Sequence, residues 1–350
     1  MDMSGILTDR MFFCAAGALL DMVYGDPHWL WHPVQGMGTM ITVFEKLLRK
    51  LFRVPAQAPA LGKGEESKTE EVDPGFHRRE LAAGICLVIL VAGISTALAA
   101  GILLLAGKVS RALYAAASIL MAWQALALRS LLTESARVRG HLEKSDVEGA
   151  RRAVSMIVGR DTAVLDAEGI ARAAVETVAE GTSDGVIAPL FWYFLFGIPG
   201  AFFYKSVNTM DSMVGYRNGR YLWFGRAAAR ADDLVNFLPA RAAGVFMTWA
   251  ARALPGMDGS GAWRIFKRDR KKHASPNAGQ TEAAMAGALD LSLGGDTVYA
   301  GSVVHKESMG DGERRTRAED IGRAGRLAAG TSILFMGAGE AVLFALSRFA

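Results

Sequence analysis

One stretch of the chain constrains the fold more than any other, because the 27 residues at positions 81–107 contain no charged side chain. As a helix, this stretch is about 40 Å long and can cross the ~30 Å hydrocarbon core of a bilayer with some tilt. A helix that is apolar on every face is either buried in a large core or spans a membrane. Its length favours the second reading, and the sequence therefore predicts an integral membrane protein.

Other apolar segments support several crossings. Residues 112–128 are also uncharged and follow a short turn at 108–111, so we expect a helical hairpin that returns to its starting side. The remaining segments are less clean, because an ionisable residue at membrane depth is costly. These are 11–24 with Asp21, 186–204 broken by Gly197 to Gly200, 234–254 with Arg241 and Arg252, and 327–347 with Glu340. We expect Asp21 and Arg252 to lie at the membrane interface.

Composition narrows the class of protein. The chain has 350 residues, of which 51% are hydrophobic and 21% charged, and the charges gather between the apolar segments, as a bilayer requires. A net charge of +4, from 39 basic and 35 acidic residues, is too small and too interleaved to indicate nucleic-acid binding. We expect one all-α, membrane-embedded catalytic domain over 1–350 in the cell membrane, and the basic flanks predict that its polar blocks face the cytoplasm.

Residues 54–80 differ from the rest of the chain. They contain Pro, Ala and Gly and then a run of mixed charge, with too few large apolar side chains to offset the entropy of ordering. We expect a flexible, charged cytoplasmic loop there. No alternating strand pattern of useful length occurs, and Cys14 and Cys86 lie in apolar runs, which makes a disulfide framework improbable.

The first of four polar blocks contains Asp26 and His32. Asp26 precedes Pro27 and is disfavoured in a helix, so this block should be a turn that leaves the first apolar helix. Two roles stay open for Asp26 and His32: ligand binding, or the capping of a helix end. For Trp29 and Trp31 we expect anchoring at the membrane interface.

The second block places Glu176, Glu180 and Asp184 at helical spacing on one face. Stacked acids repel one another, and a divalent metal with oxygen ligands would explain the arrangement. A solvated helix face is the alternative, and Arg172 four residues before Glu176 supports it. Gly181 is expected to end the helix and to leave Asp184 in the following loop.

The third block mixes cations, acids and amides beside apolar segments. Lys205, Arg217 and Arg241 could bind phosphate oxygens, and nearby carboxylates could hold a bridging Mg²⁺. Basic residues facing lipid headgroups are the alternative, which accounts for the cations but not for the interleaved acids. The acids and amides of this block are Asn208, Asp211, Asp232, Asp233 and Asn236.

The fourth block runs from Ser275 to Glu282 and includes Asn277. Ser275 followed by Pro276 resembles an N-cap and a first helical position, and a helix N-terminus beside glycine can bind an anion. Many ordinary caps look the same, so this signal is weak by itself. The sequence has no Walker loop, dinucleotide fingerprint, HExxH motif or zinc-spaced cysteine set.

Taken together, these blocks resemble the adenosylcobinamide-phosphate synthase family of cobalamin biosynthesis, the CobD/CbiB family. The resemblance covers nearly the whole chain except 54–80, in the family's order. One departure is Gly181, where the family usually has Asn. The matching elements are Gly25-Asp26-Pro27 with His32-Pro33-Val34, Gly159-Arg160-Asp161, 176–180 with 184–190, 204–215 with Arg217-Asn218, Asp232-Asp233 with Pro239-Ala240-Arg241, and 275–279 with Leu293-Gly294-Gly295 and Tyr299.

The resemblance implies an ATP- and Mg²⁺-dependent ligase. It would join a carboxylate of adenosylcobyric acid to aminopropanol phosphate, or to aminopropanol, and give adenosylcobinamide phosphate. ATP would phosphorylate the carboxylate, and the deprotonated amine would then attack. Such catalysis depends mostly on positioning and charge neutralisation and needs no strong nucleophile. A non-catalytic membrane sensor and a corrinoid transporter of similar fold are the alternatives.

The resemblance also assigns expected roles, with the lipid bilayer, a homo-oligomer or other membrane enzymes of cobalamin assembly as further partners. Mg²⁺ ligands from at least two blocks should come within about 5 Å of each other. Lys205, Arg217 and the amides after Ser275 should meet at one anion pocket. The catalytic set is Glu176, Glu180, Asp184 and Asp211; the metal set is Asp184, Asp211, Asp232 and Asp233; the substrate or phosphate set is Asp26, His32, Lys205, Asn208, Arg217, Arg241, Ser275, Asn277, Glu282 and Tyr299.

A shared active site constrains the topology. The polar segments 129–185, 205–233 and 255–326 must lie on one side of the membrane, so 186–204 cannot cross it once. Each half of that segment has only about ten residues, too few to span ~30 Å. We therefore expect a re-entrant pair of half-helices with its Gly-Pro turn buried in protein. Residues 234–254 should likewise dip and return or lie among other helices.

Overall fold

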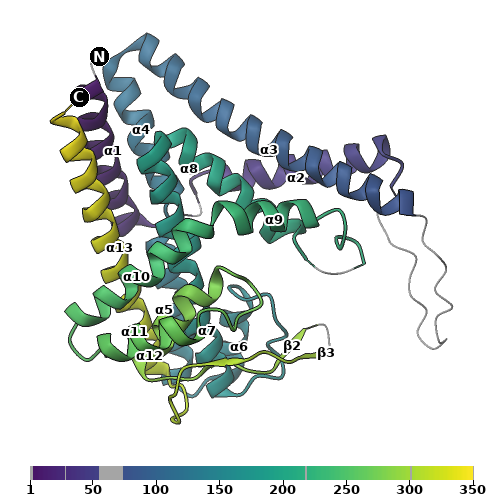
Figure 1. Cartoon of the computed structure of the whole chain (residues 1–350), viewed down its shortest axis with the longest axis vertical. Helices are drawn as coiled ribbons and strands as arrows, with labels where there is room; N and C mark the ends of the chain where they lie inside the picture. Colours follow the sequence, from purple (N-terminus) through teal and green to yellow (C-terminus); the bar gives the residue numbers. More distant parts are fainter. Residues whose placement is uncertain (1–2, 28, 55–73, 217–218, 300–301, 350) are drawn as a thin grey trace.

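The computed structural model describes residues 3–27, 29–54, 74–216, 219–299 and 302–349. Long apolar helices form one end of the molecule, and shorter helices with four small strands form the other (Figure 1). The elements are α1 (Met3–Tyr24), α2 (Pro33–Leu51), α3 (Pro74–Val109), α4 (Arg111–Ala125), α5 (Leu128–Glu143), α6 (Val147–Ser155), α7 (Ala167–Thr182), a π-helical turn η1 (Ser183–Ile187), α8 (Ala188–Val214), α9 (Arg226–Val235), α10 (Phe237–Ala253), α11 (Gly259–Asp269), α12 (Ala278–Leu289), β1 (Leu293–Gly294), β2 (Thr297–Tyr299), β3 (Ser302–Val304), β4 (Ser308–Met309) and α13 (Ala318–Ser347).

The membrane class is confirmed by four stretches of the described chain that are long and apolar enough to cross a bilayer. The predicted hairpin is α3 and α4, where Ser110 caps α4 by accepting a hydrogen bond from the backbone of Leu113 at 3.1 Å. Large apolar side chains point outward along these helices: Ile89 is 65% exposed and Leu104 is 68% exposed. Such surfaces suit a lipid environment. The four stretches are Gly75–Val109, Arg111–Glu143, Ala167–Val214 and Ala318–Ser347.

The predicted loop at 54–80 is only partly a loop, because α3 begins at Pro74; residues 55–73 lie outside the described residues. Two ion pairs explain the early start. The buried guanidinium of Arg49 on α2 contacts Glu45 at 2.9 Å and Glu80 at 3.6 Å, and it also lies over the ring of Phe224. These partners fix the first turns of α3 against α2, and they are too distant in sequence for a local pattern to reveal.

The helix predicted to end at Gly181 continues instead, because α7 passes through η1 into α8. Glycine costs about 1 kcal/mol relative to alanine inside a helix. Here the missing side chain leaves room for Leu131 of α5, which lies 2.9 Å from where a Cβ would be. Packing therefore overrides propensity. Asp184 consequently stays helical, and the carbonyl of Gly185 accepts a hydrogen bond from the backbone of Ala127 at 3.1 Å.

The predicted break in 186–204 is confirmed at Gly197, whose φ of 67° and ψ of −156° are not helical. A continuous helix would rise about 16 Å between Trp192 and Phe203. Their ring centroids are instead only 5.5 Å apart, and a Cβ on Gly200 would lie 2.4 Å from the carbonyl oxygen of Trp192. Thus α8 is two half-helices folded against each other, with the turn buried in protein as expected (Figure 1).

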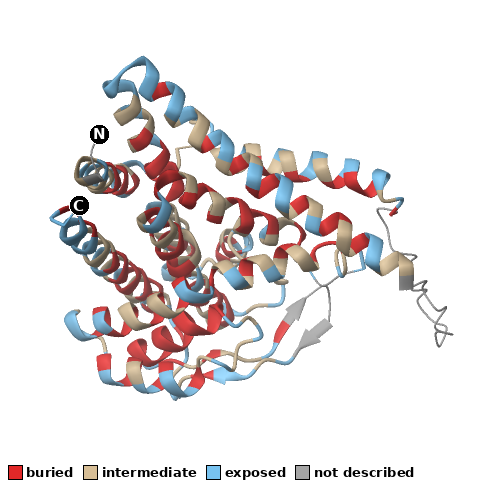
Figure 2. Cartoon of the chain, turned by 45° about the horizontal axis from the view of Figure 1, so that its top comes forward, coloured by how far each residue is buried: buried red, intermediate tan, exposed pale blue. Residues whose placement is uncertain are grey.

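The polar end has its own core, centred on α12, whose residues Ala278–Leu289 are all buried. Small residues let the helices approach closely, and a Cβ on Gly287 would lie 2.4 Å from the carbonyl oxygen of Gly261 on α11. Helix α10 packs among α11, α12 and α13, as predicted for 234–254. Figure 2 shows buried residues on the interior helices and exposed ones on the outer faces.

Four short strands were not predicted. They form two antiparallel pairs, with Leu293 of β1 opposite Met309 of β4 and Thr297 of β2 opposite Val304 of β3. Strands of two or three residues are too short to give an alternating pattern. Their position beside α7 and α12 brings the 293–309 segment to the site described below.

We predict that Gly197→Ala destabilises the fold by about 1–3 kcal/mol, because its φ and ψ lie in a region that is essentially restricted to glycine. Thermal unfolding of the detergent-solubilised protein would measure the loss. Gly101→Ala on α3 is the matched control, since a Cβ there meets nothing within 4 Å. Equal unfolding temperatures for the two variants would contradict a strained turn.

The one-sided topology predicts that cysteines at Ser155, Ser212 and Ser260 are all labelled from the same face of the membrane. These positions are exposed on the three polar segments. The experiment needs a background in which Cys14 and Cys86 are replaced by alanine, and an impermeant maleimide applied to sealed vesicles of known orientation. Labelling at Ser212 from the face opposite to Ser155 would refute the re-entrant path.

Candidate active site

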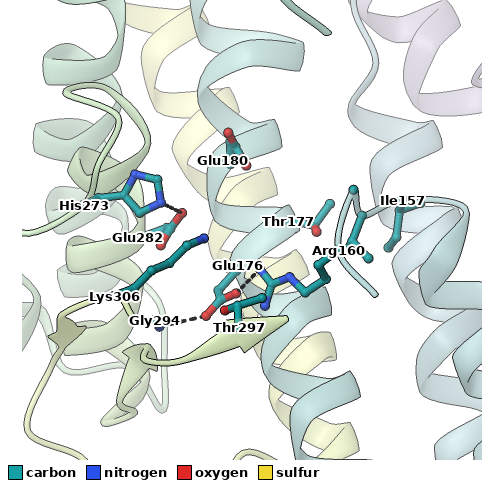
Figure 3. A pocket seen from close by; sticks show the side chains of 12 residues that line it. Ile157, Arg160, Glu176, Thr177, Glu180, His273, Glu282, Gly294, Thr297 and Lys306 are labelled. Carbon is teal, nitrogen blue, oxygen red and sulfur yellow. Dashed lines mark hydrogen bonds and ion pairs between the residues drawn. The ribbon is translucent and has the colours of Figure 1, made fainter. Parts of the chain in front are cut away.

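A polar cavity of about 190 Å³ lies between α7, α12 and the segment that follows β1 (Figure 3). Three carboxylates line it: Glu176 and Glu180 from consecutive turns of α7, and Glu282 from the first turns of α12. Two cations from other segments, Arg160 and Lys306, oppose their charge, and His273 lies beside Glu282. The remaining lining residues are Ile157, Val158, Gly159, Arg160, Thr177, His273, Gly294, Thr297 and Lys306.

Glu176 holds the walls of the cavity together. One of its oxygens accepts a hydrogen bond from Arg160 Nη2 at 2.5 Å, and the other accepts one from the backbone N–H of Gly294 at 2.8 Å. The Arg160 and Glu176 side chains are only 14% and 6% exposed. Because both oxygens are engaged, Glu176 fastens the 157–160 loop and β1 to α7.

Glu180 and Glu282 present the less engaged carboxylates. Glu180 is exposed and lines the cavity. Glu282 is 4% exposed, and its Oε1 lies 3.8 Å from His273 Nε2. Burial raises the pKa of Glu282, and the charges of Glu176 and Glu180 raise it further. Burial also lowers the pKa of His273, and the charge of Lys306 adds to this, so His273 is neutral at pH 7 and supplies no cation.

A second acidic group lies beside the first and joins the second and third sequence blocks. Asn236 Nδ2 donates to Asp184 Oδ1 at 2.5 Å, and Asn208 Nδ2 donates to Asp232 Oδ1 at 3.3 Å. Burial raises the pKa of Asp232 to about 7, with the charge of Asp211 as the next cause. The two amides orient these carboxylates without supplying a positive charge.

Asp184, Asp211 and Asp232 carry oxygen donors of the kind that Mg²⁺ binds. Within the described ranges no group of three or more His, Cys, Asp or Glu side chains is arranged to hold a metal ion. Mg²⁺ usually takes only one or two carboxylates and completes its shell with water and substrate phosphates.

The third and fourth blocks meet at Asn277. Its Nδ2 donates to the carbonyl of Asp233 at 3.0 Å, and its Oδ1 accepts from Arg241 Nη1 at 3.4 Å. Arg241 also donates to the carbonyl of Phe237 at 2.6 Å and lies over its ring. Asn277 therefore holds the start of α12 against α9 and α10.

The predicted N-cap, Ser275, lies two residues before the observed N-cap of α12, Asn277. Helix α12 begins at Ala278, and the Ser275 hydroxyl accepts hydrogen bonds from the backbone of Asn277 and Ala278 at 3.3 Å each. Pro276 is therefore not the first helical residue. The cause is a preceding turn, in which His273 Nδ1 accepts from the backbone of Ser275 at 3.0 Å.

The first block forms a separate polar pocket of about 260 Å³, with Asp26 and His32 in its lining. His32 Nε2 lies 3.5 Å from Asp26 Oδ1, and Ser130 donates to Asp26 Oδ2 at 2.8 Å. Lys205 belongs with this block, because its Nζ donates to the carbonyl of Ala125 and its charge acts on His32. The expected convergence of Lys205 with the segment after Ser275 is not what the structure shows.

Asp21, predicted to lie at the membrane interface, is buried within the protein. It is 1% exposed, and its Oδ2 accepts from the backbone N–H groups of Leu128 at 3.1 Å and Arg129 at 3.3 Å, which caps the start of α5. Arg217 and the side chain of Tyr299 lie outside the described residues.

Comparison with known proteins places these blocks in context. The model of the family described as CobD/Cbib protein matches residues 14–328. Cobalamin biosynthesis protein CobD of Geobacter metallireducens is 48% identical over 305 residues, which cover 87% of this chain and 88% of that protein. The chain belongs to the CobD/CbiB family. It therefore belongs to a family of cobalamin biosynthesis proteins.

Two further relatives extend this membership. CobD of Listeria monocytogenes is 39% identical over 312 residues, or 89% of this chain and 91% of that protein. Cobalamin biosynthesis protein CbiB of Salmonella typhi is 39% identical over 310 residues, or 88% and 90%. No solved structure matches the chain.

Three residues of this CobD/CbiB chain that line the cavity with basic or imidazole side chains were not among the predicted site residues: Arg160, His273 and Lys306. Arg160 lay in the Gly159-Arg160-Asp161 element, and that element was the available signal. His273 stands two residues before Ser275, whereas Lys306 follows a short strand and belongs to no pattern. Only the folded chain brings Lys306 to the acids of α7.

Asp269 anchors the segment that carries His273, and we predict that Asp269→Asn costs about 1–3 kcal/mol at pH 7. The buried carboxylate accepts from Arg268 Nε at 2.7 Å, Lys272 Nζ at 2.9 Å and the backbone of Gly310 at 2.9 Å. Although burial opposes it, these bonds hold the pKa of Asp269 well below its ordinary value.

This depressed pKa fixes the sign of the pH effect. The stabilisation is complete above the unfolded pKa of about 3.9 and is lost as pH falls toward the lower folded pKa. The unfolding temperatures of wild type and Asp269→Asn should therefore converge in acid. Asp296→Asn, which removes an exposed pair with His305, is the control. A pH-independent difference would show that Asp269 acts only through packing.

Proposed function

We propose that this chain is an ATP- and Mg²⁺-dependent amide ligase that joins adenosylcobyric acid to aminopropanol phosphate, or to aminopropanol, with its site facing the cytoplasm at the cell membrane. The carrying observation is that two groups lie close enough for their charges to interact: an acidic group with oxygen donors for Mg²⁺, and a cavity lined by both cations and carboxylates, with Glu180 acting on Asp184 and Asp232. The names of the relatives support the pathway, and the geometry supports a reaction between charged substrates.

The acidic group would serve the nucleotide. Asp184, Asp211 and Asp232 would hold the Mg²⁺ that accompanies ATP, and this ion supplies charge neutralisation for the transferred phosphoryl group. Asp184 and Asp232 are oriented by the amides of Asn236 and Asn208. Asp233 contributes through its backbone carbonyl, which accepts a hydrogen bond from Asn277 Nδ2.

Glu180 connects this group to the cavity. It lines the cavity, and its negative charge contributes to the raised pKa of both Asp232 and Glu282. A carboxylate in that position can take a proton from an ammonium group while the phosphoryl chemistry occurs beside it. Enclosure matters as well, because a phosphorylated carboxylate must be kept from water.

We predict that Asp184→Asn lowers the ligation rate at least about 100-fold, because it removes a charge from the Mg²⁺ position. The assay would follow amide product and ADP release by the purified protein in nanodiscs with ATP, Mg²⁺, adenosylcobyric acid and aminopropanol phosphate. Glu313→Gln, an exposed carboxylate on the polar end, is the control and should keep the wild-type rate.

The same assay separates the alternatives. A sensor would bind corrinoid without releasing ADP, and a transporter would move corrinoid into vesicles without forming an amide. Either outcome with wild-type protein would overturn the proposal. Loss of activity in Asp184→Asn is informative only at an unchanged unfolding temperature, which the same preparations would report.

A further inference from the structure

The size of the cavity beside Glu180 restricts what it can enclose. At about 190 Å³ it is smaller than the roughly 300–1,000 Å³ of pockets that take drug-sized molecules. A nucleotide or a corrinoid therefore cannot be enclosed there. Of the substrates in the proposed reaction, only the three-carbon amine is small enough.

The charges of the cavity suit a molecule with both an ammonium and a phosphate. Glu176 is neutralised by Arg160 and the Gly294 N–H, which leaves Glu180 and Glu282 as the acids that face the interior. Figure 3 shows Lys306 reaching into the cavity from the segment after β3, toward Glu282 and Glu176. The cavity thus has carboxylates on α7 and α12 and cationic groups at its rim.

Glu282 is the most specific feature. It is 4% exposed, it lines the cavity, one of its oxygens lies 3.8 Å from His273 Nε2, and the charge of Lys306 acts on it. Burying a carboxylate is costly unless a cation or hydrogen-bond donors accompany it. A bound ammonium group would supply both the positive charge and the donors.

We propose that this cavity is the subsite for the amine substrate, in which Glu282 and Glu180 bind the ammonium and Lys306 binds the phosphate. The assignment rests on the proposed function. In the coupling step Glu180 takes a proton from the ammonium, and the freed nitrogen lone pair attacks the acyl phosphate carbon. The C–N bond forms, the C–O bond to phosphate breaks, and the departing phosphate takes the second proton from the nitrogen and leaves as hydrogen phosphate.

This assignment predicts a split between two amines that differ only in the phosphate. Lys306→Met should raise the KM for aminopropanol phosphate at least about tenfold and change the KM for aminopropanol less than about twofold. Glu282→Gln should raise both, because both amines carry the ammonium. The KM values for ATP and adenosylcobyric acid should stay unchanged in both variants.

Lys271→Met, which removes an exposed lysine two residues before His273, is the matched control and should leave every KM unchanged. A rise in the KM for ATP or the corrinoid in Lys306→Met, with the amine constants intact, would overturn the assignment. If Glu282→Gln does not fold, the Lys306→Met split between the amines decides. Wild-type protein that forms no amide would refute the proposed function. If the wild type is active but the KM values of the two variants for both amines equal those of the wild type, only the subsite is refuted.

Discussion

The structure depends on the cost of burying carboxylates. Glu176, Asp232 and Glu282 are buried in the protein, where charge is poorly solvated, and Asp184 lies beside them; their partners offset that cost to different degrees. Glu176 has a guanidinium and a backbone N–H, and Asp184 and Asp232 have amides that orient but do not neutralise them. The acids that are least well compensated border the cavity and the proposed cation position, where substrates and Mg²⁺ would supply the missing charge.

The membrane helices and the polar core are linked through one continuous helical path. The acids begin on α7, the π-helical turn carries Asp184, and the chain then enters the apolar half-helices of α8. Because the turn at Gly197 sends the chain back, α9 and the Asn208–Asp232 contact return to the same end as Glu180. The re-entrant path is therefore what allows residues on both sides of an apolar segment to share one site.

The membrane class, the α3–α4 hairpin and the break at Gly197 could all be predicted from the sequence, because each depends on a local pattern of charge or backbone freedom. The early start of α3 and the continuation of α7 past Gly181 could not, since Arg49–Glu80 and Leu131 act from distant positions. The same holds for the site. Helical spacing singled out Glu176, Glu180 and Asp184, whereas Lys306 reaches the cavity only through tertiary contacts.

The π-helical turn η1 sets the orientation of α8 relative to α7. A turn with one additional residue rotates everything downstream by about 100° relative to a regular α-helix. The apolar faces of α8 therefore point in a different direction around the helix axis from the one they would have if α7 continued as a regular α-helix. No loop separates the two helices. The additional residue therefore sets the angle between the side chain of Asp184, which lies in the turn, and the apolar faces of α8. Removal of one residue from Ser183–Ile187 would reverse that rotation and uncouple the membrane anchor from the chemistry.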